Sequence, residues 1–164
     1  MVLHQRIQYL RKEHEELEHL LNTLHEFLEM TGSDDFQLRG KGLSELRAMD
    51  HHLAGILEHC HSEDRAVQSI YDRYVQDPER ARINREHHEL VLLVGRFRDE
   101  LKFATVDHTV TLTLWGKELV NRMHSHTAYE DILLNRVDAL SALPDEVVAR
   151  YIHSAGQSSP ARPN

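Results

Sequence analysis

The chain has 164 residues, of which 40% are hydrophobic, so it is long enough for one ordinary domain with a substantial core. Its formal net charge of −8 argues against a nucleic-acid-binding module, which would present a basic face to phosphates. A single cysteine, Cys60, excludes an intrachain disulfide and a metal site made of cysteines alone, and no apolar run reaches the roughly 18 residues of a membrane helix.

Apolar residues spaced by threes and fours predict four long helices, because few Gly or Pro residues interrupt them. The motifs TGSDD and RGKG separate the first two predicted helices, and QDPE precedes the third, which has a proline in its first turn. The predicted helices run from about Leu3 to Met30, from about Leu43 to Val75, from Pro78 to about Leu101, and from about Asp107 to Val137.

Four long amphipathic helices joined by short links predict an all-α, up-down-up-down four-helix bundle. We expect one bundle domain over residues 1–142. Residues 143–164 are expected to add a short helix after Pro144 and a disordered tail, GQSSPARPN. No segment shows the alternating pattern of a β-strand.

Fourteen histidines are an unusual number, and several fall on the stripes that should be buried. Glutamates stand four residues after two of them, on the same helix face. A buried carboxylate without a partner is very costly, so two in one core need compensation, which a cation supplies. The polar residues on the four stripes are His14 on the first, His52, His59 and Glu63 on the second, His87 on the third, and His126 and Glu130 on the fourth.

Six of these residues should lie at one height in the bundle. With a rise of about 1.5 Å per residue, the six residues lie at about the same distance from the shared end of each antiparallel helix pair. Four imidazoles and two carboxylates suit two iron or manganese ions better than calcium or one structural zinc. We therefore predict a dinuclear iron site. Its ligands are His14, His59, Glu63, His87, which the stripe favours over His88, His126 and Glu130.

At these positions the sequence resembles the hemerythrin-like, or HHE cation-binding, domains. Their pattern is a His on helix one, His-x-x-x-Glu on helix two, a His on helix three, and His-x-x-x-Glu or His-x-x-x-x-Asp on helix four. The matching motifs are KEHEEL, HCHSED, REHHEL and HSHTAYED, within a resemblance that covers about residues 3 to 140. It implies two non-haem iron ions, bridged by Glu63 and Glu130 with an oxo or hydroxo group between them.

One position departs from the oxygen-carrying members of that family, which have a second His four residues after the helix-three His. Here that position is Val91. The missing ligand argues against simple reversible oxygen carriage, because it leaves one more iron position open to water, peroxide or a protein ligand. Domains with this shorter set resemble iron or oxygen sensors and proteins that act on peroxide or nitric oxide.

Two function classes stay open at this point. The first binds O2, NO or peroxide for sensing, storage or iron and oxygen homeostasis, and the second is a di-iron enzyme that decomposes hydrogen peroxide. A structural bundle with adventitious metal is a weaker third reading. We expect a cytoplasmic protein whose partner is a small diatomic or peroxide ligand, without nucleic-acid or membrane partners, and with an exposed helix face that could support a homodimer.

Several neighbouring residues carry weaker predictions. His52 should be a core histidine or a proton-relay group near the site, beside Leu21, Val94 and Leu119. Cys60 should be a partly exposed thiol. Acids that follow the two glutamates should be solvated or should orient ligands. Those acids are Asp64 and Asp131, and the residues expected to face outward are His61, His124 and Tyr129.

Overall fold

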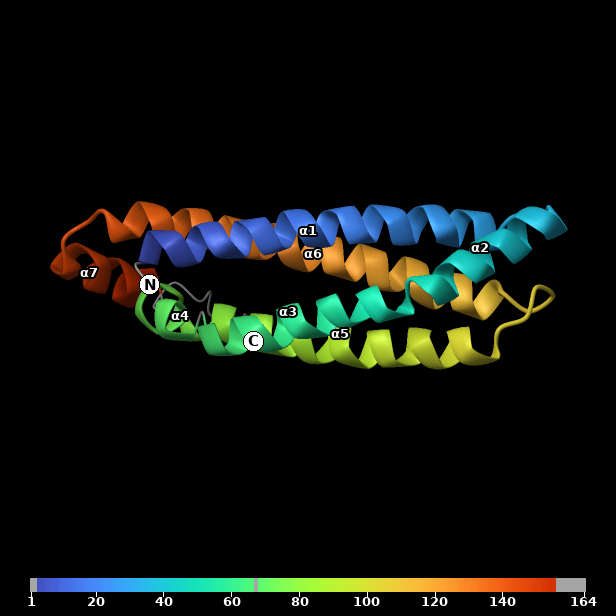
Figure 1. The fold of residues 1–164 in the computed structure, drawn as a ribbon. Helices are drawn as coiled ribbons and strands as arrows, with labels where there is room; N and C mark the ends of the chain where they lie inside the picture. Colours follow the sequence, from blue (N-terminus) through green and yellow to red (C-terminus); the bar gives the residue numbers. More distant parts are fainter. Residues whose placement is uncertain (1–2, 67, 156–164) are drawn as a thin grey trace, which may run out of the picture.

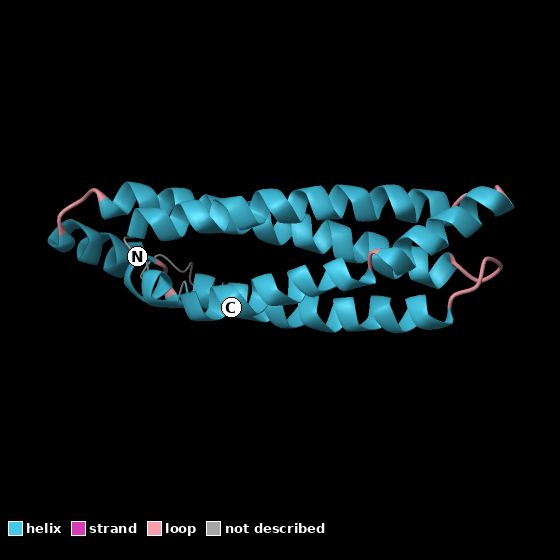
Figure 2. Cartoon of the chain, in the orientation of Figure 1, coloured by secondary structure: helices cyan, strands magenta, loops and turns pink. Residues whose placement is uncertain are grey.

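The computed structural model describes residues 3–66 and 68–155, with side chains described outside 61–69 and 153–155. Helices account for nearly all of this part, as Figure 2 shows. The helices are α1 (Leu3–Thr31), α2 (Phe36–Ala48), the short 3-10 helix η1 (Asp50–His52), α3 (Leu53–Ala66), α4 (Gln68–Tyr74), α5 (Asp77–Phe103), α6 (Val110–Ser141) and α7 (Asp145–Ala155). The described residues contain one isolated bridge, Thr105 to His108, and no strand, so the all-α prediction is confirmed.

The long helices pack lengthwise as a helical bundle (Figure 1). Contacts join α1 to α6, α6 to α5, α5 to α3 and α3 to α1, so these four enclose a common interior. The finer prediction, that four helices alternate up and down, stays a prediction. Among the helices of the described residues, none has the length and apolar character needed to cross a membrane.

The predicted second helix, from Leu43 to Val75, is wrong as a single element. It begins earlier, at Phe36, and is interrupted by η1. The RGKG motif lies inside α2, where it was expected to break the pattern. A Cβ at Gly42 would come within 2.6 Å of the backbone nitrogen of Thr31, so glycine is what lets α2 pack closely on the end of α1.

The starts of the later helices follow local chemistry. Pro78 lies in the first turn of α5, as predicted, and the backbone N–H of Gln76 donates to the Glu79 carboxylate at 3.2 Å. The fourth predicted helix, α6, begins at Val110, slightly later than expected. The short helix after Pro144 is confirmed as α7, while the tail predicted to be disordered lies outside the described residues.

Two apolar clusters share the interior, one toward each end of the bundle. The division between them falls at matching places on the long helices, and a polar layer lies there. The apolar residues that border it are Leu10 and Leu17 on α1, Ile83 and Leu90 on α5, and Met123 and Leu133 on α6.

Candidate metal centre

The polar layer contains five of the six residues that the sequence predicts as metal ligands. Each of the four helices around the interior contributes at least one, because each residue falls in the buried phase of its helix. All five are more than nine-tenths buried, and the carboxylate of Glu130 has no exposed surface. The five are His14 on α1, His59 on α3, His87 on α5, and His126 and Glu130 on α6.

Glu130 lies at the middle of the layer, with an imidazole nitrogen from every side. Its Oε2 atom is 3.3 Å from Nε2 of His14 and 3.5 Å from Nε2 of His59. Its Oε1 atom is 3.4 Å from Nε2 of His87 and 3.3 Å from Nε2 of His126. One buried carboxylate is therefore surrounded by four histidines from four helices.

This arrangement could hold a metal ion. Ligand atoms of His59, His87, His126 and Glu130 lie within 4.8 Å of one another. Neutral imidazole nitrogens and a carboxylate oxygen are donors that first-row transition metals accept. The donor set therefore fits a cation of that class. His14 lies outside this group of four, although it faces the same carboxylate.

Two outer carboxylates fix the orientation of two of these rings. Nδ1 of His14 lies 2.7 Å from Oδ1 of Asp131, and Nδ1 of His126 lies 3.0 Å from Oε2 of Glu86. A carboxylate can only accept, so the proton of each neutral ring belongs on Nδ1. The Nε2 lone pair of each ring then points toward Glu130, as a metal-binding histidine requires.

The Glu86 carboxylate is itself held in place. Arg82, one helical turn earlier on α5, donates from Nε to Oε1 of Glu86 at 2.6 Å, and its guanidinium lies 3.7 Å from the centre of the Tyr129 ring. Partial burial works to raise the pKa of Glu86, but the hydrogen bonds with Arg82 and His126 outweigh it and lower that pKa. Glu86 thus stays a charged acceptor.

Electrostatics at His126 follow from the same contacts. Burial, the largest influence, disfavours the charged ring. A charged ring would donate to Glu130 from Nε2 and to Glu86 from Nδ1, and these hydrogen bonds, with the negative charge of Glu130, nevertheless raise the pKa of His126 above its ordinary value. The layer therefore attracts positive charge, either as protons or as a cation.

Glu63 is the sixth predicted ligand. It lies on α3, one helical turn after His59, but its side chain falls outside the described set, as do those of His61 and Asp64. Its role as a ligand stays a prediction. So does the identity of all six residues as ligands of two irons.

The predictions for His52 and Cys60 are wrong. His52 is exposed, although its position was predicted to be buried, because η1 shifts the helical phase and Leu53 takes the buried place. Cys60 is buried, with 2% of its surface exposed, although it was expected to be partly exposed. It packs within the apolar cluster on the α2 side of the polar layer.

Of the other predictions, those for His88 and Asp131 agree with the structure, whereas those for His124 and Tyr129 do not. His88 is exposed while His87 is buried, as the stripe indicated. Asp131 does contact a predicted ligand. Val91, four residues after His87, packs against the apolar core. Two residues expected to face outward, His124 and Tyr129, are half-buried instead.

Sequence reasoning missed Glu86. Its one visible signal is its place directly before His87 in the motif REHHEL. The histidine that it contacts is His126, forty residues away on α6.

No family model matches the chain, and neither the curated proteins nor the solved structures that were compared contain a significant match.

Proposed function

We propose that this chain is a hemerythrin-like protein whose buried layer binds two non-haem iron ions and, at that centre, a small ligand such as O2, NO or peroxide. The observation that carries the proposal is the placement of four histidine Nε2 atoms within 3.5 Å of one buried carboxylate. Sensing, storage, or iron and oxygen homeostasis are the roles that such binding would serve.

The proposed donors come from both sides of Glu130. His59, His87 and His126 are close enough together to hold one ion with it. A second ion would use His14 and Glu63. His14 faces Glu130 from α1, and Glu63 lies one turn after His59 on α3. When bound, two irons would supply redox electrons and open positions for a small ligand.

The chain's own residues prepare this site. Asp131 and Glu86 orient two of the rings, while the apolar clusters on both sides exclude water from the layer. In a medium with little water, the negative charge of Glu130 attracts a cation more strongly than it would at the surface.

We propose further that the four helices follow the up-down-up-down order of that fold. Packing of α1 on α6, α6 on α5, α5 on α3 and α3 on α1 gives a closed ring in the order that this topology requires. In Figure 1 the chain passes along α1, returns along α3, and passes out and back again along α5 and α6.

Metal analysis of the full chain, loaded anaerobically with ferrous iron, tests the centre. We expect about two irons per chain, from the number of donors. His59→Ala and Glu130→Ala should lose most of this iron, whereas His88→Ala, an exposed neighbour of His87, should retain it. A parent that retains no iron, or variants that load like the parent, would overturn the proposal, and one iron per chain would overturn its dinuclear part.

An enzyme that decomposes hydrogen peroxide is the second candidate. It is favoured by Val91, which is packed against the core and offers no further ligand, so fewer positions of an iron pair would be filled by protein. The reaction would convert two molecules of hydrogen peroxide into two of water and one of dioxygen. Sustained oxygen release by the iron-loaded parent, absent in Glu130→Ala, would favour this enzyme. A spectral change that appears on aeration and reverses on degassing would favour ligand binding.

A further inference from the structure

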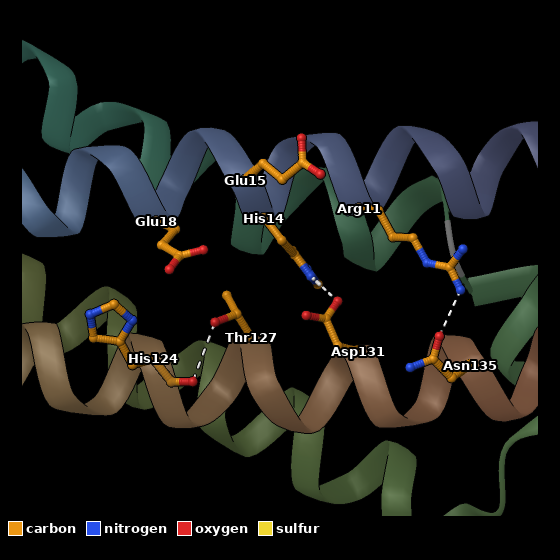
Figure 3. A pocket seen from close by; sticks show the side chains of 8 residues that line it. All are labelled: Arg11, His14, Glu15, Glu18, His124, Thr127, Asp131 and Asn135. Atoms are coloured by element: carbon orange, nitrogen blue, oxygen red, sulfur yellow. Dashed lines mark hydrogen bonds and ion pairs between the residues drawn. The ribbon is translucent and has the colours of Figure 1, made fainter.

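A cleft between α1 and α6 reaches the outer side of the candidate metal centre. It has a volume of about 280 Å³. Figure 3 shows the lining side chains of both helices, with His14 in the middle of the α1 side and the Glu15 carboxylate turned away from α6. The lining residues that matter below are His14, Glu15 and Glu18 from α1, and His124, Thr127 and Asp131 from α6.

His14, which lines this cleft, is the most exposed of the five residues of the polar layer, with 6% of its surface exposed. His14 touches Asp131 through one ring nitrogen, at 2.7 Å, and lies 3.3 Å from the Glu130 carboxylate through the other. The Asp131 side chain is 49% exposed, while Glu86, the outer partner of His126, is only 21% exposed. The outer carboxylate on the His14 side is therefore more accessible to solvent than the one on the His126 side.

The charge of the cleft is unbalanced in favour of cations. Three carboxylates line it, those of Glu15, Glu18 and Asp131. Its one arginine, Arg11, lies at the end where its guanidinium donates to the Asn135 side chain at 2.7 Å (Figure 3). Carboxylates in a recess raise the local concentration of cations and repel anions.

We propose that this cleft is the route by which a hydrated divalent metal ion reaches the buried donors. Glu15 and Glu18 attract the ion from solution, and the Asp131–His14 pair leads it inward. This inference rests on the proposed metal centre, but it concerns the rate at which the centre fills and not its capacity.

The test is the rate at which the metal-depleted full chain takes up Co²⁺, followed by visible absorption. Neutralising the two α1 carboxylates together, in Glu15→Gln/Glu18→Gln, should slow uptake about tenfold or more, because electrostatic steering typically changes association rates by that factor. The final amount bound should equal that of the parent, since neither residue is among the proposed ligands. Raising the ionic strength should slow the parent and leave the double variant nearly unchanged.

A second cleft provides the matched control. It lies between α5 and α6, has a volume of about 240 Å³, and is also lined by two glutamates, Glu89 and Glu118. None of the five residues of the polar layer lines this second cleft. Glu89→Gln/Glu118→Gln removes the same total charge, so it should take up Co²⁺ at the parent's rate.

Each outcome decides one question. A slow Glu15→Gln/Glu18→Gln variant beside a fast control supports the route. If that variant fills as fast as the parent, or if the control slows equally, the route is wrong while the metal centre stands. If the parent binds no more Co²⁺ than His59→Ala does, the proposed centre is wrong, and the proposed route is wrong with it.

Discussion

At the scale of single residues, outer carboxylates decide how two of the buried histidines face the centre. Asp131 accepts from Nδ1 of His14, and Glu86 accepts from Nδ1 of His126. With these nitrogens occupied, the other nitrogen of each ring faces Glu130. The rings are therefore oriented before any ion binds, which reduces the cost of organising the site.

Removing one outer carboxylate should weaken metal binding without removing a ligand. We expect Asp131→Ala to lower the equilibrium affinity for Co²⁺ about ten- to a hundredfold, because the His14 ring loses the partner that fixes it. Competition with a chelator of known affinity measures this at equilibrium. Asp99→Ala, which removes an exposed acid on α5 paired with Lys102, is the control and should bind like the parent. Equal affinities in the two variants would show that Asp131 does not position the ring.

The sequence pointed to Asp131 but not to Glu86, and the reason is physical. Asp131 was expected near the site because it directly follows Glu130 in the sequence, but the ring that it contacts belongs to His14 on α1. Glu86 contacts His126 across two helices, and that contact depends on how α5 is rotated against α6. The spacing of residues along a single helix gives no information about how that helix is rotated against its neighbour.

At the scale of helices, glycine serves opposite purposes at two positions on neighbouring elements. Gly116 on α6 lies where a Cβ would come within 2.3 Å of Cδ2 of Leu28 and 2.9 Å of a ring carbon of Phe97. Gly95 on α5 is exposed, and a Cβ there would meet nothing within 4 Å. Close helix packing requires the first glycine, while nothing in the structure requires the second.

Substituting alanine at these two glycines should change stability in opposite directions. We expect Gly116→Ala to lower the free energy of unfolding by about 1–3 kcal/mol, because the added methyl overpacks the contact with α1. Gly95→Ala should raise it by up to about 1 kcal/mol, because alanine restricts the unfolded chain and favours helix. Denaturant unfolding of both variants measures these differences. A loss of stability in Gly95→Ala would contradict this account of open space.

The interruption at η1 shows where a prediction from periodicity fails. His52 falls seven residues before His59, which in one continuous helix would place both on the same face. The tighter 3-10 turn changes the phase, so Leu53 is buried and His52 is exposed. The later part of the stripe, with Ile56 and His59, is predicted correctly because α3 is regular from Leu53 onward.

The same turn is joined to α5 by an ion pair whose contribution should depend on pH. Arg98 donates from two nitrogens to Asp50, at 2.7 and 2.8 Å. The hydrogen bond from Arg98 lowers the pKa of Asp50, against the smaller opposing effect of partial burial. Because the pKa is lower in the folded state, the pair stabilises the fold above the pKa of an unfolded aspartate, about 3.9, and loses that effect as the pH falls through the folded value.

Asp50→Asn should therefore cost about 0.5 kcal/mol of unfolding free energy at about pH 7, a typical value for a pair more than one-third exposed. The difference between parent and variant should shrink as the pH falls below about 4. Denaturant midpoints of both proteins across that range provide the measurement. A difference that is constant down to about pH 3 would mean that Asp50 is not stabilised by its charge.

At the scale of the whole molecule, a polar layer separates two apolar clusters that together fill the interior. Helical rise made this layer predictable, because residues at matching depths on four helices meet at one height. Because this layer is polar, its burial contributes less to the stability of the fold than the burial of the two apolar clusters does. A buried carboxylate such as Glu130 is costly unless a positive charge compensates it.

Metal should therefore stabilise the whole fold and not only the site. An ion that binds only the folded chain, present at a free concentration of a hundred times its dissociation constant, raises the free energy of unfolding by about 2.7 kcal/mol. We expect the thermal midpoint of the parent to rise on addition of Co²⁺ and to fall again on addition of a chelator. His59→Ala should show little of this shift, since it removes one of the donors nearest to Glu130, whereas His88→Ala should show all of it.

The direction of the effect separates a built centre from incidental binding at the surface. Exposed histidines such as His88 and His52 are free to bind cations in the unfolded chain as well, and binding to both states does not raise the midpoint. Only the buried layer requires the folded arrangement of α1, α3, α5 and α6. A midpoint that rises equally in the parent and in His59→Ala would therefore assign the stabilisation to other residues.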